Sequence, residues 1–169
     1  MKHRIAKRLP KCVRPEEFKE LIKKIPKKDK DSKIAFLLSY GSGLRISEVI
    51  RLKKEDVRTD SIFISQSKYA VERVVPIPKG WRKEFTKFLP LNIKIRTLQR
   101  RFKKYSNMAK LNSKYSFHSL RHGFATRLLE SGVPINQVQL LLGHSNIATT
   151  SVYTKANPID AIKSYEDLF

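Results

Sequence analysis

A single stretch of the sequence shows the two-residue alternation of apolar and polar side chains that a half-buried β-strand requires. It covers residues 61–78, SIFISQSKYAVERVVPIP, and has a polar tip near residues 68–71. This pattern predicts an antiparallel hairpin, and its two prolines favour an edge position because proline has no N–H to donate. With one such segment the chain cannot build a large sheet, so helices must supply most of the core. The apolar residues that support the hairpin are Ile62, Ile64, Val74, Val75 and Ile77.

Elsewhere the apolar residues recur at helical spacing, and glycines and prolines separate the segments. We expect Gly41 and Gly43 to break the chain after an apolar helix, Ser116 to be an N-cap, and Ser145 to cap a further helix. We expect residues 159–169 to form an amphipathic tail. The predicted fold class is α+β, mainly α, with one small antiparallel sheet. The other expected helices cover about residues 16–25, 34–40, 97–110 and 116–131, a segment beginning near residue 47, and a segment between Pro134 and Gly143.

Basic residues strongly outnumber acidic ones, with 36 lysines and arginines against 15 aspartates and glutamates and a net charge of +21. A basic surface gains free energy by displacing counterions from phosphates, so the charge predicts a nucleic-acid partner. A solvated basic surface without such a partner is the alternative. The same two interpretations apply to a basic face on the expected helix 97–110, which carries Arg100, Arg101, Lys103 and Lys104.

Several other classes of protein are disfavoured. Cys12 is the single cysteine, so the chain has no internal disulfide and no multi-cysteine zinc site. The basic N-terminus has no apolar stretch behind it, which argues against a signal peptide, and no apolar run is long enough to span a bilayer. A length of 169 residues suits one domain. We therefore expect a protein of the cytoplasm or nucleoid that makes no contact with a membrane.

The stretch HSLRHGFATRLLESGVPINQVQLLLGHSNIATTSVYTK, residues 118–155, gathers most of the chain's histidines. His118 and Arg121 share the face of a helix near its N-terminus, where backbone N–H groups favour an anion. His118 and His122 have the i, i+4 spacing of a zinc site, and His144 could be a third ligand, but no glutamate follows His118 as in the HExxH motif. Each of these residues, and Tyr153 as well, taken alone is more typical of a structural role.

Taken together, these residues resemble the C-terminal signature of the tyrosine recombinases, the integrase and Xer-type family. His118, Arg121, His144 and Tyr153 follow one another at steps of 3, 23 and 9 residues, in keeping with the family's His-x-x-Arg, Gly-His and tyrosine pattern. YGSGLRISEVIRLKKEDV, residues 40–57, resembles the family's first arginine box. SKYAVERVVPIP, residues 67–78, resembles its lysine-bearing hairpin. The first of these two blocks contains Arg45 and Glu48, and the second contains Lys68.

The resemblance implies transfer of DNA strands without a metal ion, ATP or other cofactor. Tyr153 is the expected nucleophile, but its phenol needs a base or a cationic field because its unperturbed pKa is near ~10. Arg45 and Arg121 can each donate two hydrogen bonds to the non-bridging phosphate oxygens. His118 can exchange a proton with Tyr153, and Lys68 can protonate the departing 5′ oxygen.

The remaining residues of the expected site have supporting roles. His144 can donate a further hydrogen bond to the phosphate, Glu48 is expected to orient a neighbouring side chain, and His122 is expected to support the site by hydrogen bonding. The implied product is a 3′-phosphotyrosine whose stored bond energy permits rejoining. Type IB topoisomerase-like relaxation and non-catalytic DNA binding on the same fold are the alternatives.

We expect three segments: a basic arm at residues 1–13, a tyrosine recombinase catalytic domain at 14–158, and a C-terminal tail helix at 159–169. The resemblance implies that the tail docks on a neighbouring protomer in a dimer or tetramer on double-stranded DNA; packing on its own core is the alternative. It also implies an N-terminal core-binding domain, which we expect to be missing from this chain. Chromosome-dimer resolution and mobile-element integration or excision both fit these observations.

Overall fold

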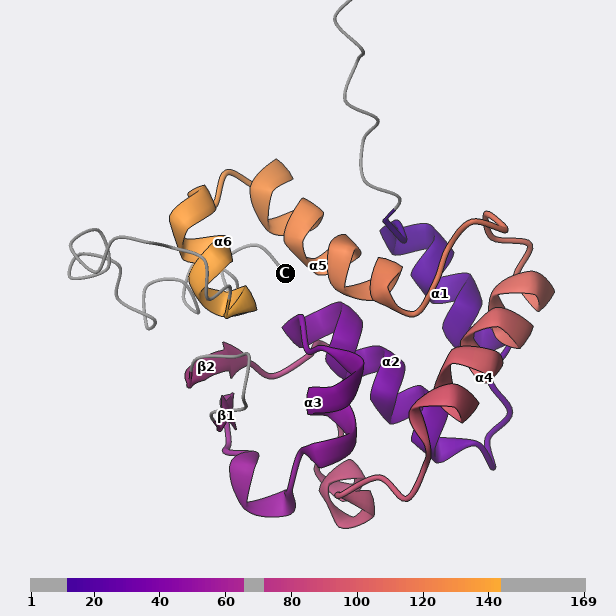
Figure 1. Ribbon diagram of the computed structural model, residues 1–169, viewed down its shortest axis with the longest axis horizontal. Coiled ribbons are helices and arrows are strands. Elements are labelled where there is room, and N and C mark those ends of the chain that lie inside the picture. The colour runs from indigo at the N-terminus through magenta and orange to yellow at the C-terminus, as the bar shows by residue number, and fades with distance from the viewer. Residues whose placement is uncertain (1–11, 66–71, 144–169) are drawn as a thin grey trace, which may run out of the picture.

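The computed structural model describes residues 12–65 and 72–143, and Figure 1 shows a mainly helical arrangement with one small hairpin. The predicted fold class is confirmed. Among the described residues, no helix has the length and apolar character needed to cross a membrane. The elements in chain order are α1 (Pro15–Lys23), α2 (Lys30–Ser42), α3 (Ile46–Arg51), η1 (Lys54–Asp56), β1 (Ser61–Ile64), β2 (Arg73–Pro76), η2 (Lys83–Phe88), α4 (Ile95–Met108), α5 (His118–Glu130) and α6 (Ile135–Leu142).

Helix α2 forms the centre of the core. It is buried on all sides from Ile34 to Ser42, as expected for a helix surrounded by protein, and it lies between α5, α4, α3 and the hairpin in Figure 1. Phe36 of α2 makes edge-to-face contacts with Phe102 of α4 and with Phe117, with ring centroids 5.6 and 5.7 Å apart. These contacts join the centre of the core to the segment that leads into α5.

The two glycines expected to break α2 have different roles. Gly43 is the C-cap, in the left-handed conformation with φ of 70°, which ends the helix as predicted. The prediction for Gly41 was wrong, because this residue is helical and lies within the last turn. A Cβ atom at Gly41 would lie 2.4 Å from the Pro78 Cβ. The glycine therefore lets the chain that leaves β2 pass close to α2.

The predicted hairpin is confirmed. Strands β1 and β2 pair antiparallel, with Ile62 opposite Val75 and Ser61 opposite Pro76. Arg73, the first residue of β2, is on the same buried face as Val75. The hairpin packs through β2 against α6 and α2, which lie above and beside it in Figure 1.

Helices α5 and α6 bring the C-terminal part of the described chain back to the hairpin. The N-cap of α5 is Phe117, so the prediction that Ser116 caps this helix was wrong. Instead the Ser116 backbone N–H donates to Ser119 Oγ at 3.1 Å, and tight turns precede the helix. Gly143 ends α6 in the left-handed conformation, with φ of 61°, as predicted.

Candidate active site

Arg45 and Glu48 meet at the N-terminus of α3. The Arg45 backbone N–H donates to Glu48 Oε2 at 2.7 Å, the arrangement in which the third helical residue reaches back to the cap. Arg45 Nη1 also lies 3.2 Å from Glu48 Oε1. The sequence RISE therefore positions both the guanidinium and the carboxylate through the start of one short helix.

Glu48 is shared by three arginines from different parts of the chain. Arg73 Nη1 and Nη2 donate to its two oxygens at 2.9 Å each, and Arg121 Nη1 lies 3.8 Å from Oε2. Burial raises the pKa of Glu48, but the hydrogen bonds and charge of Arg73, the Arg45 N–H and the charge of Arg121 outweigh it, so the pKa lies below its ordinary value. The exposed fractions of the side chains are 6% for Glu48, 2% for Arg73, 4% for Arg121 and 31% for Arg45.

Backbone carbonyls at two helix C-termini orient the arginines. Arg121 Nη1 donates to the Gly43 carbonyl beyond α2, and its Nη2 donates to the Leu142 carbonyl in α6, both at 2.7 Å. Arg45 Nη2 donates to the Gly143 carbonyl at 3.3 Å. Helix C-termini carry partial negative charge, which favours cations there. α2, α5 and α6 thus hold Arg121 close to Arg45.

This cluster has more positive than negative charge. Three guanidinium groups surround one carboxylate, so two positive charges remain unbalanced within the group. Burial, followed by the charge of Arg45, lowers the pKa of Arg121 to about 9, although Glu48 acts in the opposite direction. An anion bound beside Arg45 and Arg121 would relieve this repulsion, and a phosphodiester is such an anion.

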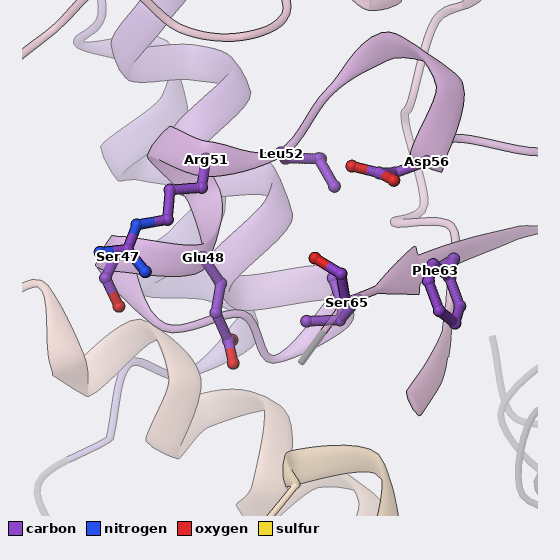
Figure 2. A pocket seen from close by; sticks show the side chains of 8 residues that line it. Ser47, Glu48, Arg51, Leu52, Asp56, Phe63 and Ser65 are labelled. Atoms are coloured by element: carbon purple, nitrogen blue, oxygen red, sulfur yellow. The ribbon is translucent and has the colours of Figure 1, made fainter. Parts of the chain in front are cut away.

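Glu48 also borders a small pocket between α3 and β1, shown in Figure 2. Ser47, Asp56 and Phe63 line the pocket, whose volume of about 70 Å³ suits a few water molecules but not a nucleotide. In Figure 2 the Glu48 carboxylate points away from Asp56 and Phe63. The carboxylate therefore serves the arginine cluster rather than this pocket.

The two histidines of α5 lie beside each other at its start. The His118 and His122 rings are 4.5 Å apart between centroids and nearly perpendicular. Burial, followed by the charge of Arg121, lowers the pKa of His122, which favours the neutral imidazole. His118 is exposed and lines a pocket of about 430 Å³ with Lys103 and Phe117. An exposed imidazole one turn from Arg121 is accessible to a substrate.

Three predicted site residues, Lys68, His144 and Tyr153, lie outside the described residues. Their neighbours in sequence are described. Lys68 belongs to the segment that joins β1 and β2, and His144 directly follows Gly143, whose carbonyl accepts from Arg45. The roles of these three residues remain predictions.

Two residues of the predicted basic face on α4 make contacts within the protein. Arg101 Nη1 donates to Asp29 Oδ1 at 2.6 Å, and Lys103 Nζ donates to the Ser113 carbonyl. Arg100 and Lys104 are exposed. Arg101 therefore helps to join α4 to the N-terminus of α2, while DNA contact by the other residues of this face remains a prediction.

Tyr105 should contribute to the same link between α4 and α2. Asp29 caps α2 and accepts from Tyr105 Oη at 2.6 Å as well as from Arg101, and burial and Asp29 together raise the pKa of Tyr105 to about 12. Tyr105→Phe should lower the free energy of unfolding by about 1–2 kcal/mol, because it removes a hydrogen bond to a nearly buried carboxylate. Urea denaturation measures this change.

Tyr115→Phe provides the matched control, because the Tyr115 hydroxyl donates to Glu17 at a longer 3.2 Å. Its loss of stability should be the smaller of the two. Equal losses in the two variants would contradict the role given to Asp29.

The sequence interpretation missed Arg73. A signal was available, since the two-residue period of β2 places this arginine on the same buried face as Val75. A charged residue at an inward strand position requires a partner, and that partner is Glu48.

The helical fold with its small hairpin and buried arginines is the arrangement of a tyrosine recombinase catalytic domain. The Phage integrase family model matches residues 11–159, and the chain belongs to this family. It is 41% identical over 170 residues to the tyrosine recombinase XerA of Thermococcus kodakarensis, a match that covers 90% of this chain and 60% of that protein. The XerA of Pyrococcus furiosus is 35% identical over 172 residues, with 90% and 59% covered. The chain thus spans about 60% of the length of these curated relatives.

Solved structures agree with this assignment. The crystal structure of a XerA recombinase matches with a TM-score of 0.69 and 26% identity, covering 94% of this chain and 65% of the other. The integrase of mycobacterium phage Brujita matches with a TM-score of 0.75, covering 97% and 60%, but its 23% identity supports the fold alone.

Proposed function

We propose that this chain is the catalytic part of a site-specific DNA recombinase that cleaves and rejoins strands through a 3′-phosphotyrosine. The arrangement of Arg45, Arg73 and Arg121 around Glu48 carries the proposal, because its three guanidinium groups exceed the local negative charge by two. A phosphodiester carries one negative charge, and the pentacoordinate phosphorane formed by attack carries two. The cluster therefore complements the transition state better than the substrate.

Each bond change has a candidate residue. The Tyr153 oxygen attacks the phosphorus and loses its proton, with His118 as the exchange partner. The bond from phosphorus to the 5′ oxygen breaks, and Lys68 gives that oxygen a proton. Arg45, Arg121 and His144 bind the non-bridging oxygens, while Glu48 and His122 support them. In the reverse reaction, the 5′-hydroxyl of another strand attacks the phosphotyrosine and releases Tyr153.

This scheme requires neither a metal ion nor ATP. The arginines supply the positive charge that a divalent ion provides in other nucleases. The phosphotyrosine conserves the energy of the broken bond, so rejoining needs no nucleotide.

The proposed substrate is double-stranded DNA, in keeping with the net charge of +21 and with the relatives that are named tyrosine recombinases. We further propose a basic arm at residues 1–13, a catalytic domain at 14–158, and a tail at 159–169 that docks on a second copy on DNA. The protein would then act on DNA in the cytoplasm or nucleoid.

A covalent trap tests the chemistry. The chain is incubated with a pool of duplexes, each nicked and randomised around the nick, in buffer that contains EDTA and no ATP. Loss of the short fragment beyond the nick prevents rejoining, so a protein–DNA adduct should accumulate. Peptide mass spectrometry should locate the DNA on Tyr153. An adduct that forms only with added Mg²⁺, or that maps to another residue, would reject the scheme.

A further inference from the structure

Arg73 has a place in the candidate active site that the proposed chemistry leaves unexplained. It begins β2, directly after the segment that contains Lys68, and its side chain is 2% exposed. A guanidinium remains charged at neutral pH, so burial at this position requires a strong set of partners.

Those partners come from two other elements. Arg73 Nη1 and Nη2 bind the two oxygens of Glu48 at 2.9 Å each, and Nε donates to the Leu141 carbonyl at 2.7 Å. One rigid side chain thus joins β2 to α3 and to the last turn of α6. A lysine could not reproduce this geometry, since its single ammonium cannot form a parallel pair of bonds and also reach a carbonyl on another element.

Arg73 also lies against the backbone that leads to His144. A Cβ atom at Gly143 would lie 2.8 Å from Arg73 Nη1 and 2.9 Å from its Cδ. The glycine therefore has two functions: it adopts the left-handed conformation that ends α6, and it leaves room for the guanidinium. The next residue in the chain is His144.

The third consequence is electrostatic. Arg73 satisfies both oxygens of Glu48, while Arg121 stays 3.8 Å from the same carboxylate and uses its bonds on two carbonyls. Without Arg73, the buried carboxylate would take Arg121 as its nearest remaining buried counter-ion. Arg121 would then be drawn away from a phosphate.

We propose that Arg73 is a positioning residue for strand cleavage: it binds both oxygens of Glu48, so that Arg121 remains available to the phosphate beside Arg45, and it fixes the end of α6, directly before His144 in the sequence. This inference rests on the proposed function. Arg73 itself does not touch the substrate. Its side chain is buried, and its Nε, Nη1 and Nη2 atoms donate to the Leu141 carbonyl and the Glu48 carboxylate inside the protein.

The test compares Arg73→Lys with the unaltered chain at saturating DNA, at a temperature at which circular dichroism shows both to be folded. The single-turnover rate of adduct formation should fall on the order of 10- to 100-fold, as expected when reacting groups are displaced. DNA affinity, measured by fluorescence anisotropy, should change less than about threefold because most of it comes from other phosphate contacts.

A substrate with a methylphosphonate at the cleaved position separates positioning from general destabilisation. Its transition state carries one negative charge fewer, so it depends less on Arg45 and Arg121. The loss of rate caused by Arg73→Lys should be several-fold smaller on this substrate than on the phosphodiester. Equal losses on both substrates would overturn the electrostatic role.

Two further variants keep the test decisive. Gly143→Ala retains every charge but pushes against the Arg73 side chain, and it should also slow cleavage, so it replaces Arg73→Lys if that variant does not fold. Arg127→Lys is the matched control, because Arg127 donates to the Tyr40 carbonyl and lies over the Tyr40 ring, outside the cluster. Its cleavage rate should be unchanged.

The possible failures are distinguishable. If the unaltered chain forms no adduct, the proposed function fails. If the unaltered chain reacts and folded Arg73→Lys or Gly143→Ala reacts at the same rate, the positioning role of Arg73 is overturned while the proposed function stands.

Discussion

Replacing Arg121 with lysine should reduce the rate of adduct formation by about 100- to 1,000-fold, the usual cost of losing a preorganised donor to a transition-state oxyanion. Arg121 bridges the Gly43 and Leu142 carbonyls at 2.7 Å on each side, and this fixes the plane of its guanidinium. A lysine ammonium can approach one carbonyl or the phosphate, but it cannot hold the same plane against both. The charge would remain while the geometry would be lost.

The measurement is the single-turnover rate at saturating DNA, with binding measured separately. Binding should change little, because a chain with 36 lysines and arginines offers many other basic side chains to phosphates. Arg82→Lys, at an exposed position just before η2, is the matched control and should react at the unaltered rate. Tyr153→Phe gives the baseline with no adduct. A rate for Arg121→Lys within tenfold of the unaltered chain would refute the role assigned to Arg121.

Replacing Glu48 with glutamine should lower the free energy of unfolding by about 3–5 kcal/mol, because it leaves buried guanidinium groups without their counter-ion. Glu48 is the carboxylate bound by Arg73 and is also the nearest described one to Arg121. Glutamine keeps the shape but carries no charge, and its amide N–H groups would face cations. Denaturant unfolding at pH 7 measures the change. Glu84→Gln, at an exposed position, should change stability by less than about 0.5 kcal/mol.

The pH dependence gives a second measure of the same group. The folded-state pKa of Glu48 lies below its unfolded value of about 4.3, so its contribution to stability is present above that value and lost as the pH falls through the folded-state pKa. The stability of the unaltered chain should therefore fall more steeply below about pH 4 than that of Glu48→Gln. Parallel curves for the two proteins would show that Glu48 is not held ionised by the arginines.

Periodicity was enough to predict most of the fold. The hairpin, the buried helix α2 and the amphipathic helix α4 followed from spacing that either matches a strand or matches a helix. The errors concerned residues whose behaviour depends on distant neighbours. Gly41 was expected to end α2, but it lies within the helix, where the lack of a side chain leaves room for Pro78. Ser116 was expected to cap α5, but its N–H binds Ser119 instead.

For the candidate site, too, the sequence could predict some features and not others. The resemblance to the tyrosine recombinase signature singled out Arg45, Glu48, His118 and Arg121 as candidates, because the family's motifs have a recognisable order and spacing in the sequence. Spacing could not show that Arg101 is bound to Asp29, which lies 72 positions away in the chain. A basic residue on an amphipathic helix has the same pattern whether it faces solvent, DNA or another part of the protein.

The sequence by itself determined the class of fold, the family and the candidate site residues, since each of these depends on local periodicity or on residue order. The tertiary structure alone decided how the arginines divide one carboxylate among them. Arg73 binds Glu48 because the fold brings the start of β2 within hydrogen-bond reach of this residue of α3. Arg121 stays 3.8 Å from Glu48 and donates instead to carbonyls at the ends of α2 and α6, at 2.7 Å each. The physical reason is that a buried charge takes whatever partner the packing brings within reach, and packing joins residues that are far apart in the chain.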